Sequence, residues 1–196
     1  EAAHFPDLEV RAVYFDKQNR RWASTQGGQL TVHQNGTNKL IRFNNKPLSE
    51  YSIVAYAIME DSRGNIWIGT KNDGLYKAMP TDLERNSYQL QHYPTVANEK
   101  KGFRIYSILE DRLHNIWIAS YDAGLIRVNE DQGVCRFYRV TVSLPKYPAN
   151  TFEQVRHLSM DRNGMVWAAT TGGLLTLQSA DRHGSGRYKV RIYRKQ

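Results

Sequence analysis

One short segment recurs four times along the chain, and this repeat restricts the fold more than any other feature. The clearest copy spans residues 61–70 and reads Asp-Ser-Arg-Gly-Asn-Ile-Trp-Ile-Gly-Thr. Each copy places an Asp six residues before a Trp, and the four pairs are Asp16 and Trp22, Asp61 and Trp67, Asp111 and Trp117, and Asp161 and Trp167. The tryptophans follow one another at intervals of 45, 50 and 50 residues. Self-similarity at this period predicts a repeat architecture.

The second repeat contains four segments with the composition of strands. Residues 53–59 and 66–70 are rich in β-branched and aromatic residues, as is typical of buried strands. Asp and Gly in the intervening residues 61–65 predict a tight turn. Residues 75–79 predict a third strand, and residues 87–93 alternate like a half-exposed fourth strand. Four strands repeated every 40–50 residues or so, roughly the length of a propeller blade, indicate a β-propeller.

The other repeats fit the same template, so the sequence predicts an all-β fold of four four-stranded antiparallel blades. The predicted blades span residues 10–44, 53–95, 104–142 and 154–196, within one propeller segment that covers residues 1–196. The first repeat is the most degenerate, and its fourth strand is expected at residues 39–43. A blade cannot bury both of its faces alone. We therefore expect these blades either to belong to a larger ring or to form half of a ring with a second copy of the chain.

The repeated tryptophans and aspartates are interpreted as structural. Each Trp occupies the same central-strand position, where a blade needs bulk to pack against its neighbour. Each Asp forms a turn, and the turn offers too few oxygen ligands for calcium. The single cysteine, Cys135, excludes an internal disulfide and a cysteine-based metal cluster. We therefore predict no metal and no cofactor.

The net charge of +8 raises the question of a polyanionic partner. Most of the excess lies in residues 182–196, which contain no acid and carry Arg182, Arg187, Lys189, Arg191, Arg194 and Lys195. Positive charge on an outer strand prevents edge-to-edge pairing, and this interpretation is preferred over a nucleic-acid site. Because no run of about 18 apolar residues occurs, the chain itself has no predicted membrane span.

A ligand is expected on the face where outer strands lead to the next inner strand. Five residues before each turn Asp the repeats differ, and these positions are Arg11, Tyr56, Tyr106 and Arg156. We expect them at the start of the inner strands, near the channel mouth. Tyr offers a flat apolar face with a hydroxyl, and Arg offers a planar fork of hydrogen-bond donors. Both side chains suit the binding of sugar rings. The alternative is a water-filled channel lining. Tyr121 and Tyr147, on loops of this face, are weaker candidates. Positive and negative charges on these loops cancel, so a neutral sugar remains possible as the ligand.

The pattern Asp-x-x-Gly-Asn-Ile-Trp-Ile-Gly-Thr-x-x-x-Gly-Leu, preceded by an apolar strand, resembles the two-component-regulator propeller repeat. Three copies match it closely, and the resemblance covers nearly the whole chain from Val10 onward. It implies the periplasmic sensor of a hybrid two-component system of gut Bacteroidetes, placed ahead of an immunoglobulin-like domain, a membrane helix, a histidine kinase, a receiver and a DNA-binding domain. The implied ligand is an oligosaccharide from a dietary or host glycan.

The resemblance also implies that kinase activity and DNA binding belong to other parts of the full-length protein. The chain has four repeats, fewer than a full ring of the family, and carries no kinase or DNA-binding motif. We therefore expect a piece of such a sensor or a short relative: a non-catalytic module without a nucleic-acid partner, reaching the membrane only through the full-length protein.

Two other functions remain open from the sequence. A propeller lyase acting on a polyuronate or lactone would need a clustered base and usually a metal. Of the histidines only His157 falls on a predicted inner strand, beside Arg156, and no carboxylate accompanies it at the matching position of another blade. No catalytic residue is therefore predicted. A protein-interaction propeller is the third class.

Overall fold

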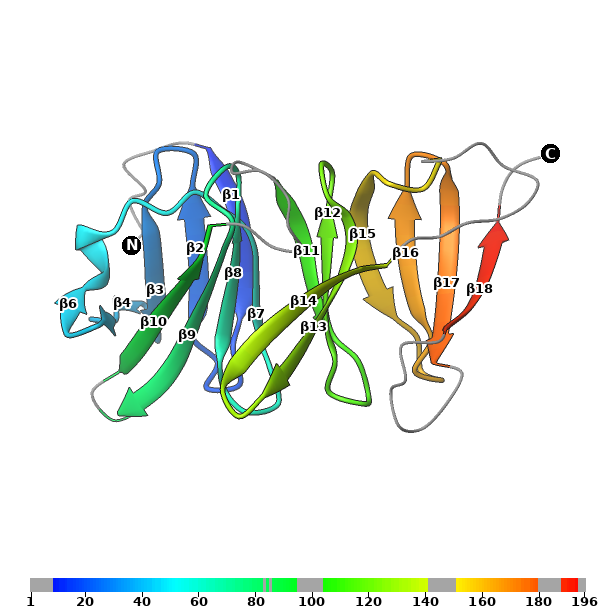
Figure 1. Cartoon of the computed structure of the whole chain (residues 1–196). Coiled ribbons are helices and arrows are strands. Elements are labelled where there is room, and N and C mark those ends of the chain that lie inside the picture. The colour runs from blue at the N-terminus through cyan, green and yellow to red at the C-terminus, as the bar shows by residue number, and fades with distance from the viewer. Residues whose placement is uncertain are drawn as a thin grey trace.

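The structure, a computed structural model, describes residues 9–82, 84, 86–94, 104–140, 151–179 and 188–193. Four small sheets follow one another in chain order and stand side by side (Figure 1). The one helical element among these residues is a 3₁₀ turn, η1 (Leu48–Glu50). This arrangement confirms the predicted all-β class and the four propeller blades. No helix in these ranges has the length and apolarity that a membrane crossing requires.

Each blade is built from strands that pair with their neighbours in sequence. The first sheet contains β1 (Val10–Phe15), β2 (Arg21–Thr25), β3 (Leu30–Gln34) and β4 (Thr37–Asn38). The second contains β7 (Ala55–Glu60), β8 (Ile66–Thr70), β9 (Leu75–Asp82) and β10 (Ser87–Tyr93), with β5 (Arg42–Phe43) and β6 (Lys46–Pro47) added outside β10. The third contains β11 (Ile105–Glu110), β12 (Ile116–Ser120), β13 (Gly124–Asp131) and β14 (Val134–Val140). The fourth contains β15 (Val155–Met160), β16 (Val166–Thr170), β17 (Gly173–Ser179) and β18 (Tyr188–Tyr193).

The prediction of a first-blade strand at residues 39–43 is wrong. The outer strand β4 ends at Asn38, and β5 instead pairs in parallel with β10 of the second blade. Phe43 in β5 is fully buried and meets the ring of Tyr88 edge-on at 6.1 Å. Burial of this side chain between the blades therefore draws the connecting segment across to the second blade, against the local pattern.

The hydrophobic core consists of three clusters, one between each pair of consecutive blades. Trp22, Trp67 and Trp117 each belong to a different cluster, and none is more than 1% exposed. The inner strand of the following blade covers each indole; β7 supplies Ala55 and Ile58, β11 supplies Ile105 and Ile108, and β15 supplies Val155 and Leu158. The packing role predicted for these tryptophans is thereby confirmed.

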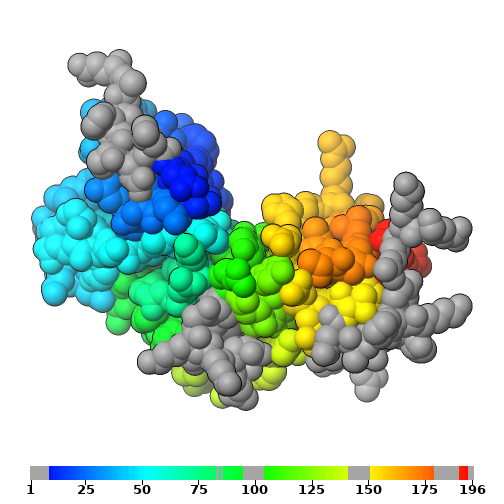
Figure 2. Space-filling view, turned by 90° about the horizontal axis from the view of Figure 1, so that it is seen from above, coloured from blue at the N-terminus to red at the C-terminus, as the bar shows by residue number. Residues whose placement is uncertain are grey.

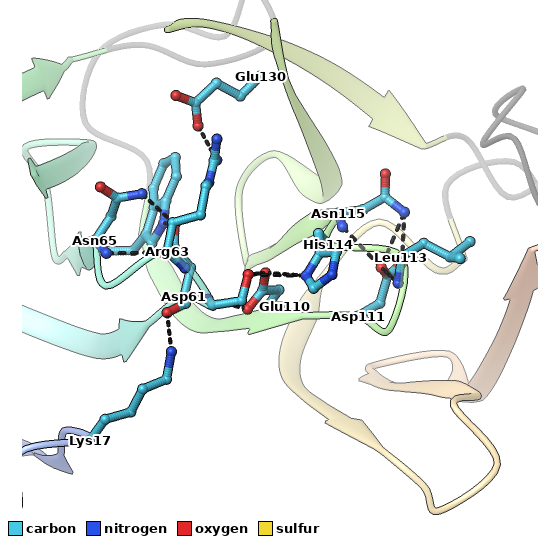
Figure 3. A network of polar contacts seen from close by, with 12 residues as sticks. Lys17, Asp61, Arg63, Asn65, Glu110, Asp111, Leu113, His114, Asn115 and Glu130 are labelled. Carbon is cyan, nitrogen blue, oxygen red and sulfur yellow. Dashed lines mark hydrogen bonds and ion pairs between the residues drawn. The ribbon is translucent and has the colours of Figure 1, made fainter.

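The four aspartates build the same turn in each blade. In the second blade, Asp61 Oδ1 accepts the backbone N–H groups of Arg63 and Asn65, while Oδ2 accepts the indole N–H of Trp67 at 2.8 Å (Figure 3). Asp16, Asp111 and Asp161 accept the corresponding indole N–H at 2.8, 2.8 and 3.1 Å. The carboxylate therefore ties each turn to the tryptophan six residues later, as expected for a turn former.

The described parts of the blades form an open arc (Figure 2). On the first blade Val10 and Val13 are 42% and 56% exposed, whereas their equivalents on the other inner strands are buried against the preceding blade. On the last blade Trp167 is only half-buried and stacks on Tyr193 at 5.5 Å. We call the surface around Val10 and Val13 the leading face and the surface around Trp167 and Leu174 the trailing face. They are the two unmatched halves of the interface that occurs three times inside the chain.

Candidate functional site

Each inner strand contains a bulge at the same position. In β7, Ala55 pairs with Thr70 and Ala57 with Gly69, so Tyr56 has no residue opposite it. The same slip of register leaves out the equivalent residue of each other inner strand, and these residues are Arg11, Tyr106 and Arg156. A bulge redirects the extra side chain and is common next to functional sites. The four positions singled out by the sequence are therefore the four bulged residues.

The bulged residues touch one another across consecutive blades. The guanidinium of Arg11 lies 5.7 Å from the ring centre of Tyr56. The rings of Tyr56 and Tyr106 are 5.6 Å apart and inclined by 32°. The guanidinium of Arg156 lies 5.9 Å from the ring centre of Tyr106. An arginine thus flanks each end of a tyrosine pair, and cation–π attraction favours this order.

Tyr121 joins this group from the turn between β12 and β13. Its ring meets that of Tyr106 edge-on at 6.4 Å. The guanidinium of Arg156 lies 4.8 Å from its centre and that of Arg104 lies 4.7 Å from it. Tyr121 is therefore more central than the sequence indicated. We call Arg11, Tyr56, Tyr106, Tyr121 and Arg156 the rim row.

Arg104 was not among the predicted site residues. It precedes β11 and grips Asp122 with two nitrogens, at 3.0 Å from Nε and 2.7 Å from Nη2, while its backbone N–H also donates to Asp122 at 2.9 Å. This pairing raises the pKa of Arg104 and lowers that of Asp122. The sequence offers one signal for Arg104, which is its place just before an inner strand. The other repeats have no Arg at this position, so a comparison of equivalent positions does not find it.

The polar groups of the rim row differ in whether they are already engaged. Arg11 donates from Nε to Gln26 at 2.7 Å and pairs through Nη2 with Glu9 at 2.6 Å. By contrast, the exposed guanidinium of Arg156 forms no hydrogen bond or ion pair with any described residue. The same holds for the hydroxyl groups of the three tyrosines in the row. These groups therefore have unused donors and acceptors at this end of the inner strands.

The structure thus brings five of the six predicted residues together. Tyr147, the sixth, lies outside the described residues. Ligand binding by any of them stays a prediction. His157, the residue considered for a lyase, is exposed beside Arg156 in β15. Across the ranges given above, no group of three or more His, Cys, Asp or Glu residues is placed to hold a metal ion.

A comparison with protein families supports the repeat assignment. The model described as two component regulator propeller matches residues 47–72, which contain the first two strands and the Asp turn of the second blade. This match confirms the resemblance drawn from the sequence pattern. A search of curated proteins found no significant match.

Solved structures share this fold over most of the chain. The extracellular domain of a hybrid two-component system from B. thetaiotaomicron aligns with a TM-score of 0.65 and 19% identity, covering 97% of this chain and 26% of that one. PorZ, a surface component of the type-IX secretion system of Porphyromonas gingivalis, aligns with a TM-score of 0.58 and 16% identity, covering 88% and 27%. A catalytically inactive virginiamycin B lyase from Staphylococcus aureus aligns with a TM-score of 0.64 and 12% identity, covering 97% and 58%.

These alignments define the fold alone, because the identities are low. The chain spans 26% of the length of the Bacteroides domain and 27% of that of PorZ.

Proposed function

We propose that this chain is a non-catalytic part of the periplasmic sensor of a hybrid two-component system, and that it binds a glycan-derived oligosaccharide. The family match at residues 47–72 and the fold shared with a Bacteroides two-component system support the sensor role. The observation that carries the ligand proposal is the rim row. The bulged positions of the four repeats carry large polar or aromatic side chains, and these side chains meet at one end of the inner strands.

The chemistry of the rim row suits a sugar. The tyrosine rings of the row offer flat apolar faces to the carbons of a pyranose ring, and their free hydroxyls can donate to or accept from its oxygens. Arg156 adds a planar set of donors that match vicinal sugar oxygens. Because the row runs from the first blade to the fourth, an extended oligosaccharide would contact several blades at once. Such a ligand would stabilise one arrangement of the blades over others.

Signalling requires that binding reach a histidine kinase elsewhere in the full-length protein. We propose that the leading and trailing faces are covered by further propeller blades or by a second copy of the chain. The residues of these two faces are buried at the equivalent positions of the three interfaces between blades inside the chain, which supports this proposal. A ligand that reorders the rim row would then change how two sensors associate, and the membrane would be reached only through the full-length protein.

Titration calorimetry against plant and host oligosaccharides tests the proposal. We expect Tyr106→Ala to weaken the binding of any sugar found by about tenfold or more, because the ring contacts both Tyr56 and Tyr121. Tyr138→Ala is the matched control, since Tyr138 is an exposed tyrosine of the same blade on the outer strand β14. Equal affinity of the Tyr106 variant and the control would contradict the rim row as the binding site.

A propeller lyase is the second candidate, favoured by the fold shared with virginiamycin B lyase. Metal-dependent turnover of a polyuronate or a lactone would support the lyase and contradict the non-catalytic assignment. A scaffold for other proteins is the third class, and it predicts no saccharide binding at all.

A further inference from the structure

The three arginines that contact the rim tyrosines differ in charge balance. Arg11 pairs with Glu9 at 2.6 Å, and Arg104 holds both oxygens of Asp122. Arg156 has no carboxylate within ion-pair distance among the described residues. Of these three arginines, Arg156 is the one whose charge no described acid neutralises.

Two acidic residues could be expected to neutralise Arg156, one close to it in sequence and one next to Tyr121. Both form ion pairs with other arginines. Glu153, three residues earlier, pairs with Arg139 at 3.3 Å. Asp122, which follows Tyr121, is held by Arg104, and its pKa is lowered by that contact. Neither carboxylate can turn to Arg156 without giving up the ion pair that it already forms. The local charge therefore stays positive even though the charges of the surrounding loops cancel.

The position of Arg156 is nevertheless defined. Its guanidinium lies 4.8 Å from the ring centre of Tyr121 and 5.9 Å from that of Tyr106. A guanidinium stacked on an aromatic face keeps the donors at its edge free. Those donors form a planar fork that binds two oxygens of an anionic group, and charge-assisted hydrogen bonds of this kind are roughly twice as strong as neutral ones.

We propose that Arg156, Tyr106 and Tyr121 form an anion subsite at the fourth-blade end of the rim row, and that it takes the anionic group of an acidic sugar, a uronate carboxylate or a sulfate ester. The two tyrosines contact the ring of that sugar while Arg156 binds its charge. This inference rests on the proposed function and narrows its ligand from oligosaccharides in general to acidic ones. It also goes against the sequence-based argument that left neutral sugars open, because one unpaired cation in contact with the ligand outweighs distant charges that cancel.

Calorimetry with matched sugars separates this inference from the function on which it rests. The probes are uronate oligosaccharides, their carboxyl-reduced neutral counterparts and sulfated neutral oligosaccharides. We expect an acidic probe to bind at least about tenfold more tightly than its neutral counterpart, and the preference to shrink as salt is added. The uronate and sulfate arms identify which anion the subsite takes.

Variants at Arg156 provide the second readout. Arg156→Gln should abolish the preference for the acidic probe, because the acidic probe loses a charge-assisted hydrogen bond whereas the neutral probe loses only a neutral one. Arg156→Lys should retain part of the preference. Arg136→Gln is the control, because it removes the same charge from the exposed outer strand β14. Thermal unfolding of each variant verifies that it folds.

The possible failures are distinguishable. Equal binding of acidic and neutral probes, or a preference that survives in Arg156→Gln, overturns the anion subsite and leaves a neutral-sugar sensor standing. The absence of binding by every probe overturns the proposed function and the subsite together.

Discussion

Each turn aspartate holds its turn through several hydrogen bonds, and Asp61 shows how they are arranged. Its two oxygens accept four hydrogen bonds, from the backbone N–H of Arg63 and Asn65, the side-chain amide of Asn65 and the indole of Trp67. Because the indole is fully buried, water cannot replace the lost acceptor. Asp161 makes the same turn beside Trp167, whose ring is half exposed on the trailing face.

We therefore predict that the same substitution has unequal costs in two repeats. Asp61→Ala should lower the free energy of unfolding by about 3 kcal/mol, since it leaves a buried indole N–H unpaired. Asp161→Ala, the matched control, should cost about 1 kcal/mol, because water can bind the indole there. Urea unfolding of both variants measures the difference. Equal losses of unfolding free energy would mean that burial of the tryptophan does not determine how much the aspartate stabilises the fold.

At the scale of elements, consecutive blades are joined by polar contacts as well as by the core. After the first two turn aspartates, the next backbone N–H donates to a Glu at the end of the following inner strand, from Lys17 to Glu60 and from Ser62 to Glu110, both at 2.6 Å. His114 lies 3.0 Å from Glu110 in the same network (Figure 3). Met160 replaces this Glu in the fourth blade. These contacts position β7 and β11, and with them the bulged residues Tyr56 and Tyr106.

The spacing between blades also depends on one glycine. Gly69 in β8 lies so close to β11 that an added Cβ would stand 2.3 Å from Cγ2 of Ile105. Its backbone φ is not positive, so close approach, and not a special conformation, requires the glycine.

We predict that Gly69→Ala costs about 1–3 kcal/mol of unfolding free energy by overpacking this interface. Ile105→Ala removes Cγ2, the atom nearest to the added Cβ, and so relieves the closest clash, while Cβ of residue 105 remains 2.8 Å away. The substitution has its own cost for the cavity. The double variant should therefore cost clearly less than the sum of the two single variants. Additive costs in urea unfolding would place the effect of Gly69→Ala within its own strand and not between blades.

At the scale of the whole molecule, the two open faces are complementary. The leading face presents Val10 and Val13, whose equivalents in the other blades cover a tryptophan. The trailing face presents Trp167 and Leu174, whose equivalents are covered. Exposed apolar faces of this kind favour association with a surface that supplies the missing half.

We predict that the isolated 196-residue chain associates as its concentration rises, through the leading face of one copy and the trailing face of another. Light scattering should show a mass above 22.6 kDa for the natural sequence. Val13→Glu should reduce the association because it places a charge in the contact. Val134→Glu, at a similarly exposed valine on the outer strand β14, should leave it unchanged. A monomer at every concentration would contradict the prediction.

The sequence by itself determined the repeats, the blades and the equivalent positions of the rim row. Strand pairing within a blade joins neighbours in the chain, so the alternation of apolar segments and Asp-Gly turns was enough to predict it. The same reasoning assigned Trp22, Trp67 and Trp117 to the core, because a residue repeated at one place in every blade meets the same surroundings.

The tertiary structure alone decided the contacts between blades. Residues 42–43 pair with the second blade because Phe43 is buried against Tyr88, a residue distant in sequence. No local pattern marked the bulges that redirect Tyr56 and Arg156. Nor did any mark the ion pair of Arg104 with Asp122, which leaves Arg156 as the one of the three arginines without a described acidic partner. Charge balance at a surface depends on which groups come within a few ångströms, and only the packing of one blade on the next determines that distance.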